Sequence, residues 1–255
     1  MPQPFPSGAS PLLVFDFDGV LVDGMAEYWW AARSAALRLA PGLDLPTVAP
    51  PAFARLRPLI HQGWEMVLMA AELARPDLQL ARLLGDYGSA VAEALQRWGW
   101  DATLLQECLE QVRAEAIAAD LPAWLGLHRF YPGVVERLRG LAHEGVDWAV
   151  LTTKGGVFAG QILAAAGLEP WALYGHEHGS KPAVLRQLLK RRDPVWFVED
   201  RRPTLEVVRA DPELAPVRCF LVSWGYLGPD DQRDLPAGIG WLEPARFAAP
   251  LADWI

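Results

Sequence analysis

The sequence predicts an α/β fold in which a parallel sheet carries an all-helical insertion after its first strand. Two patterns predict it. Residues 25–129 place apolar side chains at three- and four-residue spacing, which is typical of helices. After residue 133, short apolar runs alternate with helical segments, as in parallel sheets buried on both faces. With 255 residues, 52% of them hydrophobic and 21% charged, the chain is long and apolar enough for one core with a large insertion.

The first predicted strand is the apolar run 12–15, which follows a proline-rich start expected to be irregular. The run ends abruptly at Asp16, and the insertion begins soon afterwards. Within the insertion, helical spacing occupies four segments: Tyr28–Leu39, Phe53–Leu73, Ala90–Trp98 and Leu104–Ala118. Because a helical insertion offers no strands, the partners of the first strand must come from the chain that follows it.

The chain after Tyr131-Pro132-Gly133 is predicted to alternate between helix and strand. The expected helices are Val134–Glu144, Val157–Ala166, Ala183–Arg191 and Thr204–Ala210, and the expected strands are Val146–Leu151, Ala172–Tyr174, Val195–Val198 and Val217–Val222. Strands joined through helices form parallel sheets. The predicted domains are a core of residues 1–23 and 131–255 and a helical insertion of residues 24–130.

Composition and charge exclude several classes of protein. The formal net charge of −8 gives the chain no overall attraction to nucleic acid or to an anionic membrane surface. Cys108 and Cys219 match no disulfide framework or zinc spacing, so both are expected to be thiols in a reducing compartment. The first residues lack the basic region of a signal peptide, and no run of 18 apolar residues occurs. We therefore expect a cytoplasmic protein with no membrane span and no nucleic-acid partner.

The chemistry is expected at the carboxyl ends of the strands, where open parallel sheets bind their ligands. Four polar groups stand there: Asp16 with Asp18, Thr152 with Thr153 and Lys154, Lys181, and Glu199 with Asp200. At spacing i, i+2 in an extended segment, Asp16 and Asp18 point to the same side. All four groups belong to one edge of the predicted sheet.

A divalent cation would allow so many carboxylates to converge. Like charges held together unpaired make one another costly to ionise, and Mg²⁺ accepts carboxylate oxygens together with waters and a phosphate. Lys181 and the Thr152 hydroxyl suit an anionic substrate, and Gly19 permits a close backbone approach. Singly, each segment has a structural alternative, since Asp-Phe-Asp-Gly can end a strand and Glu199-Asp200 can cap a helix. Their order along one edge favours a site.

Four segments carry a family resemblance. DFDGVLVD, LTTK, GSKP and VED resemble the four ordered motifs of the haloacid dehalogenase-like (HAD) hydrolase superfamily. YPGVVERLRGLAHEGVDWAVLTTK and the later WGY at residues 224–226 resemble the members with a helical cap, the phosphoglycolate phosphatase-like group above all. The resemblance covers residues 12–23 and 131–228. It implies a Rossmann-like core with the cap inserted after the first strand.

The resemblance also implies a role for each site residue. Asp16 would be the nucleophile that forms an aspartyl-phosphate, and Asp18 would be the general acid and base. Mg²⁺ would be held by Asp16, the main-chain carbonyl of Asp18 and Asp200, with Glu199 beside them. Thr152 would bind phosphoryl oxygens, and Lys181 would bridge phosphate and nucleophile. Substrate contacts are expected from Gly19, Thr153 and Arg33, although a solvated helix face is the simpler interpretation of Arg33.

Three positions depart from the family pattern. Gly24 follows Asp23 where a small polar residue is often seen. Thr153 stands where asparagine is frequent, and Thr204 stands where many members carry a second aspartate. Other members use an adjacent acidic pair in place of that aspartate, and Glu199-Asp200 supplies such a pair here, so metal binding is still expected. The basic pair Arg201-Arg202 is less usual. It is expected either to contact an anionic substrate or to face solvent, and the second interpretation is slightly favoured.

These inferences predict an enzyme, a Mg²⁺-dependent phosphatase acting on a small phosphorylated metabolite. A sugar phosphomutase of the same superfamily is the first alternative, because it shares the Glu-Asp metal pair. A dehalogenase is disfavoured, since that chemistry needs no metal. A catalytically silent HAD-fold binding protein is the remaining alternative, and the retained set of acids, threonine and lysine argues against it.

Overall fold

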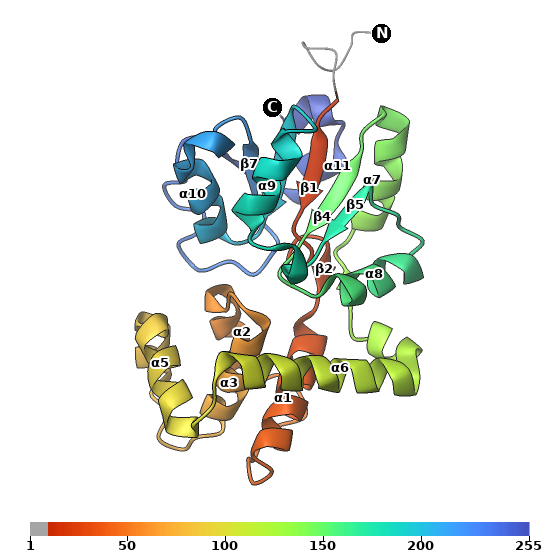
Figure 1. The fold of residues 1–255 in the computed structure, drawn as a ribbon. Coiled ribbons are helices and arrows are strands. Elements are labelled where there is room, and N and C mark those ends of the chain that lie inside the picture. Colours follow the sequence, from red (N-terminus) through yellow and green to blue (C-terminus); the bar gives the residue numbers. More distant parts are fainter. Residues whose placement is uncertain (1–9, 255) are drawn as a thin grey trace. The chain divides into compact units, whose positions relative to one another are not determined.

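The sheet follows directly from the apolar runs of the sequence. This structure is a computed structural model that describes residues 10–254, so the irregular start expected at residues 1–9 lies outside the described residues. The chain forms two compact units, one made of the chain up to Asp23 and from Phe130 onward, and the other of Gly24–Arg129 (Figure 1). We call them the sheet unit and the helical unit.

The sheet unit carries a six-stranded sheet. Its strands are β1 Leu12–Phe15, β4 Trp148–Leu151, β5 Ala172–Tyr174, β6 Val195–Glu199, β7 Arg218–Val222 and β8 Ile239–Leu242. Their order is β5-β4-β1-β6-β7-β8, and the neighbouring strands pair in parallel. β1 is central, with Val14 opposite Ala149 on one side and Phe197 on the other. The predicted α/β fold is therefore confirmed, including a first strand whose partners follow the insertion.

Helices cover both faces of the sheet, and the alternation of side chains along the strands decides which residues meet them. The helices of this unit are α7 Val134–Leu141, α8 Gly156–Ala165, α9 Lys181–Leu189, α10 Arg202–Ala210 and α11 Pro244–Ala248, with 3₁₀ turns η2 Ala142–Glu144, η3 His176–His178, η4 Pro212–Leu214 and η5 Leu251–Trp254. Leu12 and Val14 pack in an aliphatic core with Leu185 of α9 and Leu205 of α10.

The opposite face of the sheet is aromatic. The ring of Phe15 makes edge contacts with those of Trp148 and Phe247, and Trp254 packs against Phe220. These rings come from β1, β4, β7, α11 and η5, so the carboxyl-terminal elements close this face. β8 and α11 were not predicted, because the run Ile239–Leu242 is short and contains a glycine, which weakens a strand pattern.

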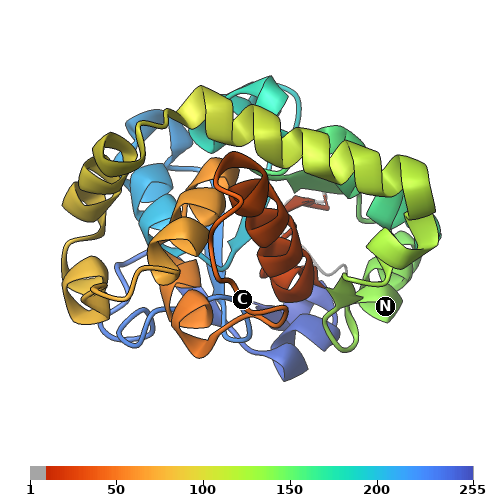
Figure 2. The same cartoon turned by 90° about the horizontal axis from the view of Figure 1, so that it is seen from below.

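Two short strands, β2 Val22–Asp23 and β3 Arg129–Phe130, pair where the chain leaves and re-enters the sheet unit. The helical unit contains α1 Met25–Leu39, α2 Pro51–Leu56, 3₁₀ turn η1 Arg57–Leu59, α3 Gly63–Leu73, α4 Leu80–Gly85, α5 Tyr87–Trp98 and α6 Ala102–Leu125. α1, α3 and α6 pack against one another (Figure 2). Among the described residues, no helix combines the length and hydropathy that a membrane crossing requires.

The segment Phe53–Leu73, in which the apolar spacing predicts helical structure, is helical but is not one continuous helix. The chain forms α2, the turn η1 and then α3, whose start is closed by a reciprocal capping box between Gln62 and Glu65. Pro58 lies in η1 and has no amide hydrogen to continue a helix, which accounts for the interruption. α6 continues beyond the predicted end at residue 118 and kinks at Asp120, two residues before Pro122.

A buried ion pair joins α1 to α6. Arg113 Nε and Nη2 donate to the two carboxylate oxygens of Glu27 at 2.6 and 2.8 Å, and the two side chains are 4% and 0% exposed. A charge withdrawn from water so completely is tolerated because its partner is present and well oriented. The pair fixes the first turn of α1 to the middle of α6.

We expect Arg113→Met to lower the free energy of unfolding by about 3–5 kcal/mol, because the substitution removes the guanidinium from a buried carboxylate. Urea denaturation followed by circular dichroism measures the change. Arg38→Met is the matched control, since Arg38 pairs with Glu115 at the surface and should leave the midpoint nearly unchanged. Equal midpoints for the two variants would show that the Glu27–Arg113 pair contributes nothing to the fold.

Candidate active site

Three buried carboxylates meet where β1 and β6 end. Asp16 follows β1, Glu199 is the last residue of β6, and Asp200 comes next. β1 and β6 are neighbours with Phe15 opposite Val198, so their carboxyl ends coincide. One oxygen from each carboxylate lies within 4.8 Å of the other two. The structure thus brings together acids that are more than 180 residues apart in the chain.

Lys181 stands between two of these acids. Its Nζ lies 2.7 Å from Asp16 Oδ1 and 2.6 Å from Glu199 Oε2. The lysine is the first residue of α9, which begins beside the same edge of the sheet. Burial alone would lower the pKa of Lys181, but the carboxylates of Asp16 and Glu199 raise it above its ordinary value. The amine therefore stays an ammonium ion.

Burial and neighbouring charges also shift the pKa values of two of the acids. Burial, followed by the charge of Glu199, raises the pKa of Asp16 to about 7. Glu199 is equally buried, but Lys181 and the neighbouring backbone amides hold its pKa below the usual value. Glu199 Oε1 accepts the N–H groups of Asp200 and Arg201, each at 3.2 Å, while its Oε2 accepts Lys181.

A second lysine accompanies Asp18. Lys154 Nζ lies 3.4 Å from Asp18 Oδ1, and both side chains are buried. The sequence interpretation placed Lys154 at this edge without giving it a role. The composition could have pointed to Lys154, because the chain has 20 arginines and only three lysines. Two of those three lysines are the buried ones at this site, where a compact ammonium fits better than a guanidinium.

These charges fit a divalent cation. Four carboxyl groups, those of Asp16, Asp18, Glu199 and Asp200, face two ammonium groups, so acidic groups outnumber basic ones in a buried place. The donors are carboxylate oxygens, the hard ligands that Mg²⁺ prefers. Because Glu199 already bonds Lys181 and two backbone amides, Asp16 and Asp200 are the carboxylates better placed to ligate.

The threonines lie at the end of β4. Thr152 is buried, and its hydroxyl oxygen accepts the N–H of Lys154 at 3.0 Å. Thr153 beside it is half-buried. Gly19 has a φ of +92°, and a Cβ there would overlap Asp200 Oδ2, so the close approach expected of this glycine is toward Asp200.

Two sequence expectations for arginines change. Arg202 does not simply face solvent, because its guanidinium donates to the carbonyls of Arg233 and Asp234 and pairs with Glu206. It therefore shapes the loop before β8. Arg33 lies on α1, and its Nε donates to the Leu45 carbonyl at 3.0 Å, so its guanidinium anchors a loop of the helical unit. The predicted part of Arg33 in substrate binding remains a prediction.

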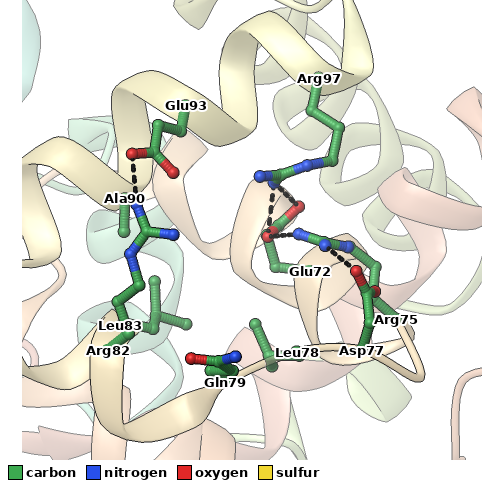
Figure 3. A pocket seen from close by; sticks show the side chains of 10 residues that line it. All are labelled: Glu72, Arg75, Asp77, Leu78, Gln79, Arg82, Leu83, Ala90, Glu93 and Arg97. Carbon is green, nitrogen blue, oxygen red and sulfur yellow. Dashed lines mark hydrogen bonds and ion pairs between the residues drawn. The ribbon is translucent and has the colours of Figure 1, made fainter.

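The helical unit contains a polar cavity of about 180 Å³ between α3, α4 and α5 (Figure 3). Four ion pairs join the residues of its walls: Arg75 with Asp77 and with Glu72, Arg97 with Glu72, and Arg82 with Glu93. Glu72 also accepts the indole N–H of Trp98, which ties α3 to α5. Since each guanidinium lining this cavity meets a carboxylate, the cluster at the sheet edge is the better candidate for chemistry.

Comparisons with known proteins identify the family of this chain. The family model for haloacid dehalogenase-like hydrolases matches residues 11–206. Phosphoglycolate phosphatase of Pseudomonas putida is 25% identical over 240 residues, covering 88% of this chain and 73% of that protein. The corresponding protein of Pseudomonas savastanoi pv. phaseolicola is 26% identical over 245 residues with the same coverage.

Solved structures share the fold. A predicted phosphoglycolate phosphatase from Haemophilus somnus 129PT superposes with a TM-score of 0.61 at 19% identity, covering 94% of this chain and 95% of that one. A haloacid dehalogenase-like hydrolase from Streptococcus pneumoniae gives a TM-score of 0.58 at 15% identity, with coverages of 92% and 95%. At such identities the likeness establishes the fold alone.

Proposed function

Because this chain belongs to the haloacid dehalogenase-like hydrolases, we propose that it is a cytoplasmic, Mg²⁺-dependent phosphatase of a small phosphorylated metabolite. The observation that carries the proposal is the buried Asp16 carboxylate, 2.7 Å from Lys181 Nζ and clustered with Asp200 and Glu199. The curated relatives, named phosphoglycolate phosphatases, support a phosphate monoester as the substrate class.

A carboxylate nucleophile must overcome repulsion from the phosphate. At 4 Å and an effective dielectric constant of about 20, each unit-charge pair costs about 4 kcal/mol, so a dianion costs roughly 8 kcal/mol. That would slow attack on the order of a millionfold. Lys181 lies against Asp16 and supplies one of the compensating charges. Bound Mg²⁺, held by Asp16, Asp200 and the Asp18 carbonyl with Glu199 beside them, would neutralise the phosphoryl oxygens.

Asp16 and Asp18 would carry out the two chemical steps of the hydrolysis. A carboxylate oxygen of Asp16 attacks phosphorus, the ester P–O bond breaks, and Asp18 gives its proton to the leaving oxygen. Asp18 next takes a proton from water, whose oxygen attacks the aspartyl-phosphate. Inorganic phosphate leaves, and the Asp16 carboxylate is regenerated. Lys154, against Asp18, holds that side chain in place.

The remaining residues bind and orient. The Thr152 oxygen accepts the Lys154 N–H, which leaves the hydroxyl hydrogen to donate to a phosphoryl oxygen. Glu199, bonded to Lys181 and to two backbone amides, fixes the ammonium beside Asp16. We propose that the helical unit acts as the cap that selects the metabolite, with Gly19, Thr153 and Arg33 as substrate contacts.

A phosphate-release screen over phosphorylated metabolites, run with Mg²⁺ and with EDTA, tests the proposal. We expect release from a small monoester, phosphoglycolate being the first candidate, and loss of release in EDTA. Phosphate release that persists in EDTA would contradict the proposed metal requirement. Absence of release from every substrate would favour the alternative of a catalytically silent binding protein. Turnover that requires a sugar bisphosphate would identify the phosphomutase.

We expect Lys154→Met to lower kcat/KM by about 10- to 100-fold, because it removes a buried ammonium from Asp18 and from the anionic substrate. Steady-state phosphate release measures the effect. Lys190→Met is the matched control, since Lys190 is the third lysine and is exposed at the end of α9. Equal kcat/KM values for the two variants would show that Lys154 takes no part in the reaction.

A further inference from the structure

The loop Trp224–Tyr226, which follows β7, contacts Asp200 of the acid cluster and the segment that follows Asp18. The indole N–H of Trp224 donates to the Val20 carbonyl at 3.0 Å. The backbone N–H of Tyr226 donates to Asp200 Oδ2 at 2.7 Å, and its phenol donates to Asp23 Oδ1 at 2.7 Å. The loop is therefore joined both to Asp200 and to the segment that follows Asp18.

Asp200 sits between two glycine backbones. A Cβ at Gly19 would overlap Asp200 Oδ2, and a Cβ at Gly225 would overlap Asp200 Cβ and the Gly19 carbonyl oxygen. No larger residue fits at either position without displacing the carboxylate. The rotamer of Asp200 thus depends on where the backbone of this loop lies.

We propose that Tyr226 is a positioning residue for the cation site. Its phenol bond to Asp23 fixes the loop, and the loop's backbone N–H then holds the Asp200 carboxylate in the orientation that binds a divalent cation. A phenol bonded to a carboxylate is a strong, directional restraint, because the acceptor is charged. The inference rests on the proposed function, since it assumes that Asp200 ligates Mg²⁺.

The test is Tyr226→Phe, which removes one hydroxyl and keeps the ring and the backbone N–H. Isothermal titration calorimetry with Mg²⁺ alone, without substrate, should show a dissociation constant about 3- to 10-fold higher than in the wild type, the range expected for one lost hydrogen bond. The Mg²⁺ concentration for half-maximal phosphate release should rise by the same factor, while kcat at saturating Mg²⁺ stays within about twofold.

The matched control is Tyr87→Phe in the helical unit. Tyr87 donates its phenol to the Glu65 carboxylate at 2.8 Å, so the variant loses a bond of the same kind between two residues of the helical unit. Its Mg²⁺ affinity should equal that of the wild type. Asp23→Ala should weaken Mg²⁺ binding at least as much as Tyr226→Phe, and the double variant should lose no more than Asp23→Ala. Asp23→Asn, which keeps an acceptor oxygen, should recover part of the affinity.

Wild-type Mg²⁺ affinity in Tyr226→Phe would overturn the inference alone. If the melting temperature of the metal-free variant also falls by more than that of Tyr87→Phe, the phenol bond is structural. A wild-type protein that binds no Mg²⁺ would overturn the metal in the proposed function as well, so the two failures are distinguishable.

Discussion

Asp16→Asn is expected to reduce phosphate release by about 10⁵-fold or more, because an amide in place of the carboxylate cannot attack phosphorus. The substitution nearly preserves size and shape, so loss of activity with the fold retained assigns the effect to chemistry. Burial in the wild type also keeps the attacking oxygen away from bulk water, where hydration would blunt it. Steady-state release from the best substrate of the screen measures the change.

The matched control for this prediction is Asp147→Asn. Asp147 is a half-exposed aspartate paired with Arg192 before β4, and the same chemical change there should leave turnover within about twofold. A second readout is covalent: acid quenching during turnover should trap phosphate on the wild-type protein and none on Asp16→Asn. Residual turnover of the Asp16 variant within tenfold of wild type would refute the aspartyl-phosphate.

The sequence could predict which residues reach the sheet edge, because strand ends are marked by abrupt changes from apolar to polar side chains. Asp16, Thr152 and Asp200 each follow such a change, and parallel pairing brings them to one edge. Periodicity also separated the helical insertion from the sheet, since a 3.6-residue repeat and a continuous apolar run bury different faces.

The family resemblance implies a contact between Lys181 and Asp16, which the structure contains. Other pairings between side chains could not be predicted, because distance along the chain does not specify which carboxylate an amine meets. Lys154 lies at the same edge and contacts Asp18, a pair that no sequence pattern specifies. The bond between Tyr226 and Asp23 spans 203 residues and depends on the course of an irregular loop. Such contacts are set by tertiary packing, and the spacing of apolar residues along the chain does not specify them.

Lys181→Met is expected to lower kcat by about 10³-fold, because it removes the only ammonium between Asp16 and Glu199 among the residues that the structure describes. Methionine matches the length of the lysine stem, so packing along α9 is largely kept. The two carboxylates then face each other without compensation, and a phosphate dianion approaching Asp16 meets their combined repulsion. Phosphate release at saturating Mg²⁺ measures the loss.

Lys190→Met separates this effect from a general loss of positive charge. Both substitutions remove one ammonium from α9 or its end, but Lys190 is exposed and should leave kcat within about twofold. The kcat of Glu199→Gln should lie between those of Lys181→Met and Lys190→Met. Lys181 keeps Asp16 as a partner in this variant but loses the charged acceptor on its other side. If Lys181→Met instead keeps kcat and raises only KM, the ammonium binds the substrate's phosphate without stabilising the transition state, and its bridging role is wrong.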